Sequence, residues 1–135
     1  MGYQIDEIEG IGPVNREKLV AIGIETCGDL LAKCGSKKGR TECSATTGIG
    51  ESQLLTWANM ADMMRVSGIG PQFAELLEAS GVDTVKELQH RNAANLAAKM
   101  EEVNKEKNLA NAVPAESVIE KWIVQAKEME PTITH

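Results

Sequence analysis

Aromatic side chains are scarce in this sequence: two tryptophans, one tyrosine and one phenylalanine make up 3% of its 135 residues. A hydrophobic core must therefore be built mainly from Leu, Ile, Val, Ala and Met, a set that suits short packed helices. Few rings remain for stacking on nucleobases. The sequence therefore argues against a binding surface that depends on aromatic stacking.

Long apolar runs are also missing, since no stretch reaches the roughly 18 residues of a transmembrane helix. The first ten residues lack the basic and apolar regions of a signal peptide. The three cysteines are odd in number, and their spacing fits neither a disulfide framework nor a zinc knuckle. We therefore expect a cytoplasmic protein without membrane association, cofactor, metal site or small-molecule substrate, with core-packed thiols at Cys27, Cys34 and Cys43.

Basic residues are outnumbered, with 14 Lys and Arg against 20 Asp and Glu and a formal net charge of −6. An acidic chain repels phosphate backbones at long range, so nucleic-acid binding would need a local basic patch. One cluster without an intervening acid is present: Lys33, Lys37, Lys38 and Arg40. This cluster is either a phosphate-binding loop or a solvated loop that leads into a helix, and the pattern leaves both readings open.

An internal repeat organises the sequence. The residues GIGP at 10–13 recur at 68–71, and the same offset of 58 carries GIET at 23–26 onto GVDT at 81–84. Further along, Trp57 and its neighbours recur around Trp122 at an offset of 65, and both tryptophans are expected in the core. The seven additional residues are expected within 93–107. We predict two units, residues 1–63 and 64–130, followed by a flexible tail at 131–135.

Helical periodicity is frequent, and no segment alternates as a β-strand does. Thr26 with Asp29 and Thr84 with Glu87 have the spacing of helix capping boxes. The prediction is therefore an all-α fold.

Three segments share the pattern Gly-Ile-Gly, and each is followed directly by a helical pattern. Glycine allows the positive φ of a tight turn, and the isoleucine is expected to point inward. The second glycine leaves the first N–H groups of the next helix uncovered, so that they can bind a phosphate. The pattern predicts tandem helix-hairpin-helix motifs, arranged as two pseudo-repeated units packed as one body. The three segments are Gly10-Ile11-Gly12, Gly48-Ile49-Gly50 and Gly68-Ile69-Gly70.

Several longer motifs carry a resemblance to a known family: EGIGP, GDLL, KKGR, TGIGES, GVDTVKEL and EVNKEKNL. With these motifs the chain resembles the bacterial domain of unknown function 4332, a family of small tandem helix-hairpin-helix proteins, over about residues 6–128. The resemblance implies a cytoplasmic, all-α protein. It implies nucleic-acid binding only as a prediction from the motif, and it brings no catalytic residues.

Two functions remain open at this point, and neither is enzymatic, because nothing in the sequence marks a catalytic residue. The first is weak, sequence-independent binding of a DNA or RNA backbone through the hairpin amides. The second is a protein–protein scaffold or adaptor. The motif favours the first, whereas the acidic charge and the lack of a basic residue at Val14, Ser52 and Gln72 favour the second. The candidate nucleic-acid-binding residues are Gly10, Ile11, Gly12, Arg16, Lys18, Gly48, Ile49, Gly50, Gly68, Ile69, Gly70, Lys37, Lys38 and Arg40.

Overall fold

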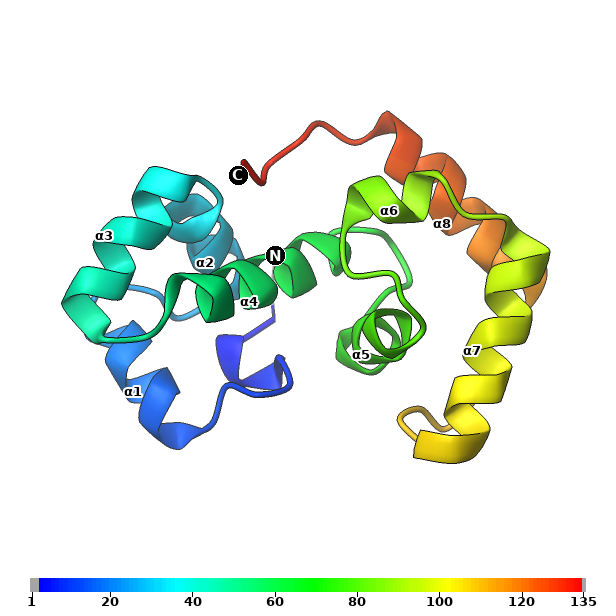
Figure 1. Cartoon of the computed structure of the whole chain (residues 1–135), viewed down its shortest axis with the longest axis horizontal. Coiled ribbons are helices and arrows are strands. Elements are labelled where there is room, and N and C mark those ends of the chain that lie inside the picture. The colour runs from blue at the N-terminus through cyan, green and yellow to red at the C-terminus, as the bar shows by residue number, and fades with distance from the viewer. Residues whose placement is uncertain (1–2, 135) are drawn as a thin grey trace. The chain divides into compact units, whose positions relative to one another are not determined.

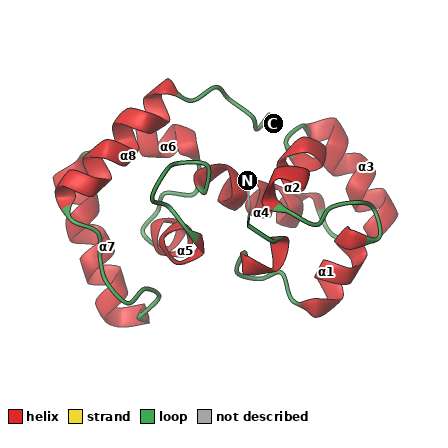
Figure 2. Cartoon of the chain, turned by 180° about the vertical axis from the view of Figure 1, so that it is seen from behind, coloured by secondary structure: helices red, strands yellow, loops and turns green. Residues whose placement is uncertain are grey.

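The computed structural model describes residues 3–134, and within that range the chain is all-α, as predicted (Figures 1 and 2). A single 3₁₀ turn, η1 (Ile5–Glu7), precedes the α-helices. The helices are α1 (Pro13–Val20), α2 (Cys27–Cys34), α3 (Lys37–Thr47), α4 (Glu51–Met63), α5 (Pro71–Ala79), α6 (Val85–Gln89), α7 (Ala93–Lys107) and α8 (Glu116–Glu128). No helix among the described residues is both long and apolar enough to cross a membrane.

The chain divides into two compact units. Unit 1 is formed by Met1–Asp62 together with Pro131–His135, and unit 2 by Met63–Glu130. In sequence, unit 2 is therefore an insertion into unit 1. The tail at 131–135 was predicted to be flexible, but its described residues, 131–134, are hydrogen-bonded to unit 1, and His135 lies outside the described residues.

The two units contain helices in the same order. The last helix of each, α4 and α8, has 13 residues. The connection before α8 spans residues 108–115, whereas the one before α4 spans only 48–50. This connection is thus five residues longer, and α7, with 15 residues, is four residues longer than α3, with 11. The additional length expected within 93–107 therefore lies partly in α7 and partly in the connection that follows it. The longer connection is held by Asn104, whose side-chain amide both donates to and accepts from the backbone of Ala110, each at 3.0 Å.

Unit 1 packs its helices around aliphatic side chains and one tryptophan. α2 packs on α3, and α1 packs on the 3₁₀ turn. The N-terminal segment is held by backbone hydrogen bonds from Ile5 N to Glu25 O and from Cys27 N to Tyr3 O. The fully buried side chains of this core include Ile5, Ile8, Leu19, Ile24, Leu30, Leu54 and Trp57.

Unit 2 is built around α8, which packs on α6 and α7, while α5 packs on α7. Trp122 on α8 is buried, and its ring lies 5.5 Å from that of Phe73 on α5, at a tilt of 53°. The remaining core side chains include Ile69, Leu76, Leu77, Leu88, Leu96, Met100 and Ile119. The expectation that both tryptophans are core residues is confirmed.

The predicted capping boxes differ in completeness. At α2, the Thr26 hydroxyl accepts from Asp29 N, and Asp29 Oδ2 accepts from Thr26 N, both at 3.1 Å. At α6, the Thr84 hydroxyl accepts from Glu87 N at 2.9 Å. Glu87 instead forms an ion pair with Arg91 at 3.0 Å. The reciprocal half of the second box is therefore replaced by an ion pair within the same unit.

Candidate nucleic-acid interface

The three Gly-Ile-Gly segments form turns of one type, named here turn 1 (10–12), turn 2 (48–50) and turn 3 (68–70). The first glycine of each turn has a positive φ: 96° at Gly10, 78° at Gly48 and 94° at Gly68. The isoleucine of each turn is buried, as predicted, and a helix follows directly. A side chain at the first glycine would strain the backbone, so the sequence requirement is conformational.

Turns 1 and 3 lead into helices whose N-termini carry no side-chain cap. Gly12 and Gly70 are the N-cap residues of α1 and α5, and neither helix has an acid in its first turn. Within residues 3–134, no hydrogen bond uses the first-turn amides of Val14 in α1 or Gln72 in α5. These amides carry the positive end of the helix dipole.

Four other helices have their N-termini closed by side chains. In each case the oxygen of the N-cap residue accepts a hydrogen bond from the backbone amide three positions later. The capping residues are Thr26 for α2, Ser36 for α3, Thr84 for α6 and Asn92 for α7. α8 also begins without a side-chain cap, at Ala115, but it has Glu116 in its first turn. The open N-termini of α1 and α5 therefore differ from the four capped ones and, because they lack a first-turn acid, from that of α8.

Turn 2 differs from turns 1 and 3 because an acid stands in the first turn of its helix. Glu51 is the first residue of α4, and its Oε1 accepts from the Thr41 hydroxyl at 2.7 Å. The amide of Ile49 donates to the Thr47 hydroxyl at 3.2 Å. A carboxylate held at this place complements the helix dipole and repels a phosphate. Turn 2 is thus the weakest anion site of the three.

The buried tryptophans lie directly against the first glycines of turns 1 and 3. A Cβ built on Gly10 would lie 3.4 Å from Trp57 Nε1, and one on Gly68 would lie 3.0 Å from Trp122 Nε1. Trp57 Nε1 is buried without a hydrogen-bond partner. α4 and α8 therefore support the two turns from the core side. The sequence predicted a core role for the tryptophans but gave no sign of their contact with the turns.

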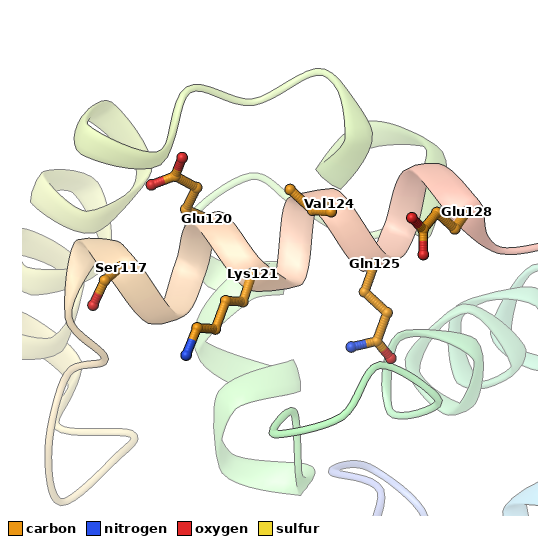
Figure 3. A pocket seen from close by; sticks show the side chains of 6 residues that line it. All are labelled: Ser117, Glu120, Lys121, Val124, Gln125 and Glu128. Carbon is orange, nitrogen blue, oxygen red and sulfur yellow. The ribbon is translucent and has the colours of Figure 1, made fainter.

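Turn 3 is also held by the exposed face of α8. Gln125 Oε1 accepts from the amide of Ser67, next to the turn, at 2.9 Å. Lys121 lies one helical turn earlier and leaves α8 on the same side as Gln125 (Figure 3). Both residues line a shallow groove together with Ser117, Glu120, Val124 and Glu128. The sequence offered no basic residue for turn 3, because Lys121 lies more than fifty positions away along the chain.

The basic residues predicted for turn 1 lie on α1. Arg16 Nε is 3.7 Å from Asp6 Oδ2, and both side chains are nearly half exposed. Lys18 is exposed in the last turn of α1. Lys37 and Lys38 are exposed in the first turn of α3, at an N-terminus that is already capped.

Arg40 has a different position from the one expected of a phosphate ligand. Its side chain is 3% exposed, and Nη1 donates to the carbonyls of Cys34 and Gly35 at 3.1 and 2.9 Å. Nη2 donates to the carbonyl of Thr134. The guanidinium is thus satisfied by backbone carbonyls at the end of α2 and in the tail. Its assignment to a surface phosphate site is wrong, because a count of charges along the sequence cannot show burial.

The three cysteines are buried and free. Burial raises the pKa of Cys27 to about 11 and that of Cys34 to about 12, so both thiols are protonated at neutral pH. Cys43 lies beside Cys34. Within residues 3–134, no three potential metal-ligating side chains come together. These positions agree with the expected packing role.

Comparison with known proteins gives one match. The model of a family described as "Domain of unknown function (DUF4332)" matches residues 9–129. The chain belongs to this family. The match spans turns 1, 2 and 3 as well as the eight α-helices found in residues 3–134 of the DUF4332 chain. No curated protein and no solved structure matches the chain.

Proposed function

We propose that this DUF4332 chain is a non-catalytic module that binds the sugar-phosphate backbone of nucleic acid without sequence preference. In this proposal each unit is a helix-hairpin-helix unit, and a phosphate is held by the first-turn amides of α1 or α5. The observation that supports it most is the contrast between these two open N-termini and the four that are closed by side chains. Backbone amides at a helix N-terminus bind anions through hydrogen bonds and the helix dipole.

Few basic side chains lie near turns 1 and 3, and acids lie beside them, so the expected affinity for a phosphate is low. Arg16 on α1 supplies positive charge near turn 1, although Asp6 partly neutralises it, and Lys18 lies farther away, in the last turn of α1. Lys121 supplies positive charge on the side of α8 that holds turn 3. Turn 2 contributes little because of Glu51, and Arg40 contributes nothing because it is buried. The proposal therefore reduces the predicted set of three hairpins to two phosphate sites, one in each unit.

The proposal can be tested by placing an acid in the first turns of α1 and α5, one position beyond the site that Glu51 occupies at the start of α4. Val14→Glu and Gln72→Glu introduce a carboxylate into the first turns of α1 and α5, where it complements the helix dipole and should leave the fold intact. Ala98→Glu, on the exposed surface of α7, is the control with the same change in net charge. Fluorescence anisotropy with a labelled DNA duplex and a labelled RNA duplex is the measurement.

We expect the wild-type chain to bind, and its affinity to fall roughly tenfold between about 50 and 200 mM salt, as two neutralised phosphates require. Val14→Glu and Gln72→Glu each weaken binding, and the double variant abolishes it. Ala98→Glu binds as the wild type does. Absence of wild-type binding at about 50 mM salt, or an equal loss in Ala98→Glu, would contradict the proposal.

The alternative is a protein-interaction module that has lost phosphate binding. One observation favours it: Val14, in the first turn of α1, is 67% exposed and places an apolar side chain beside turn 1. An apolar contact at this position would resist salt. Purification of partners from cell extract, with and without nuclease treatment, distinguishes the two functions, because only a protein partner survives the nuclease.

A further inference from the structure

The C-terminal segment Pro131–Thr134 is bound to unit 1 through three groups that we call the cradle: the Gly35 carbonyl, the Arg40 guanidinium and the Asp62 carboxylate. Thr134 donates its amide to Gly35 O at 2.8 Å and accepts from Arg40 Nη2 on its own carbonyl. The Thr132 hydroxyl donates to Asp62 Oδ1 at 2.6 Å. Both backbone groups of one residue and the side chain two positions earlier are therefore recognised.

The cradle is shaped for a closely approaching main chain. A Cβ on Gly35 would lie 2.6 Å from Thr132 O and equally close to Leu31 O, so glycine is required here both by the end of α2 and by the close approach of the segment. Arg40 and Asp62 are 3% and 6% exposed. Arg40 is held in place by its bonds to the carbonyls at the end of α2. The binding groups are thus pre-positioned by the fold of unit 1 and not by the segment alone.

The chemistry of the cradle specifies the kind of ligand. It offers an acceptor in the Gly35 carbonyl, a donor in Arg40 and a second acceptor in Asp62. A backbone phosphodiester has no donor for the carbonyl and is repelled by the carboxylate. An extended peptide satisfies all three when a serine or threonine precedes the backbone-paired residue by two positions. Recognition of this type depends on main-chain hydrogen bonds, with a side chain adding specificity.

We propose that the cradle is a receptor for an extended segment of a partner protein with this pattern, and that the C-terminal segment is its built-in competitor. The segment is short, and its hold consists of a few hydrogen bonds, so it opens readily. When it opens, the Gly35 carbonyl, Arg40 Nη2 and Asp62 Oδ1 each lose the hydrogen bond that they form with the segment. A partner segment with a hydroxyl residue at the equivalent position satisfies the same groups.

The tether determines which partners can compete. A segment joined to its site by a short linker acts at an effective concentration in the millimolar range. A second copy of this chain at micromolar concentration offers the same contacts without that advantage, so reciprocal exchange of tails is not expected. A partner segment must bind the cradle more tightly than the chain's own tail, through residues beyond the three contacts.

The test uses the full chain with its own tail released. Thr134→Pro removes the amide that Gly35 accepts from, and Thr132→Val removes the hydroxyl that Asp62 accepts from. Both positions lie at the end of the chain and are exposed, so the core is untouched. The probe is a fluorescent peptide with the sequence of residues 129–134, titrated against wild type, the double variant and a Thr134→Ala control that keeps both backbone groups.

We expect the peptide to bind the double variant about tenfold more tightly than it binds the wild type or Thr134→Ala, since the tethered competitor is gone. A peptide that carries the same two substitutions should not bind. The proposal is overturned if the double variant shows no saturable binding up to a few millimolar peptide, or if wild type and double variant bind alike. Equal binding of the substituted peptide, or dimerisation of the wild type at micromolar concentration in light scattering, also counts against it. None of these outcomes depends on binding to nucleic acid.

Discussion

Single residues set the geometry of the turns, and glycine is required there for two separable reasons. Gly48 has a positive φ, and a Cβ on it would meet nothing within 4 Å. Gly68 has a positive φ as well, and a Cβ on it would lie 3.0 Å from Trp122 Nε1. The backbone conformation is the same requirement in both turns, whereas the close contact with tryptophan is found only at turns 1 and 3.

We predict that Gly48→Ala costs about 1–2 kcal/mol of unfolding free energy, which is the cost of a left-handed conformation for alanine. Gly68→Ala should cost at least about 1 kcal/mol more, because the tryptophan must shift within a packed core. Urea denaturation of each variant measures the difference. Equal losses for the two substitutions would show that the contact with Trp122 has no energetic weight.

The sequence indicated the turn glycines and the buried isoleucines because they are local features with a strict pattern. Arg40 was misread for the opposite reason. Its carbonyl partner Thr134 lies 94 residues away, and no local pattern reports such a bond. Lys121 was missed in the same way, since it is placed only by α8, which carries it on the same side as Gln125, the residue that bonds the Ser67 amide (Figure 3).

At the scale of helices, the hydrogen bonds at the helix ends determine where each helix begins and how its charged groups titrate. α2 begins with a complete capping box, in which the carboxylate of Asp29 accepts from the amides of Glu25 and Thr26, each at 3.1 Å. These two backbone hydrogen bonds, the one from Glu25 first, lower the pKa of Asp29 below its usual value. The folded state therefore holds this carboxylate in its charged form more firmly than the unfolded chain does.

The lowered pKa gives a pH dependence of stability with a definite sign. The contribution of Asp29 is fully present above its pKa in the unfolded chain and is lost as the pH falls through its lower pKa in the folded protein. Asp29→Asn should therefore be less stable than the wild type at about pH 6, and the gap should narrow by about pH 3. Urea midpoints at the two pH values measure this gap, and Thr84→Ala, which removes the cap hydroxyl of α6 and leaves Asp29 untouched, is the control. A constant gap would contradict the assignment.

The helix order was largely visible in the sequence, whereas the connections were not. The caps at Thr26 and Thr84 marked helix starts correctly, because capping depends on residues only three positions apart. The extra length of the second unit was assigned to the helix at 93–107, but it is divided between α7, which is four residues longer than α3, and the connection 108–115, which is five residues longer than 48–50. That connection is fixed by one asparagine side chain, Asn104, and a bond of this kind has no periodicity to detect.

At the scale of the whole chain, the division into units is not a division into halves of the sequence. Unit 1 needs both ends of the described chain, since Pro131–Thr134 completes it by binding at Gly35, Arg40 and Asp62. Unit 2 is continuous. Each unit also contains one tryptophan, Trp57 or Trp122, so the stability of each can be followed separately.

We predict that Thr134→Pro destabilises the two units unequally. In a Trp122→Phe background, fluorescence of Trp57 should report a lower urea midpoint for unit 1 when Thr134→Pro is added. In a Trp57→Phe background, the midpoint reported by Trp122 should change little, because the lost bonds all lie in unit 1. Equal shifts of the two midpoints would mean that the tail stabilises the chain as a whole.

The discontinuity of unit 1 has a consequence for biosynthesis. A ribosome releases the chain from the N-terminus, and domains generally fold as they emerge. Residues 1–62 leave the ribosome long before Thr132 and Thr134. While unit 2 is being translated, Arg40 and Asp62 therefore lack their hydrogen bonds to these two residues. During that interval the surface that we propose to bind peptides lacks the chain's own tail, so a chaperone or a binding partner would reach it most easily then.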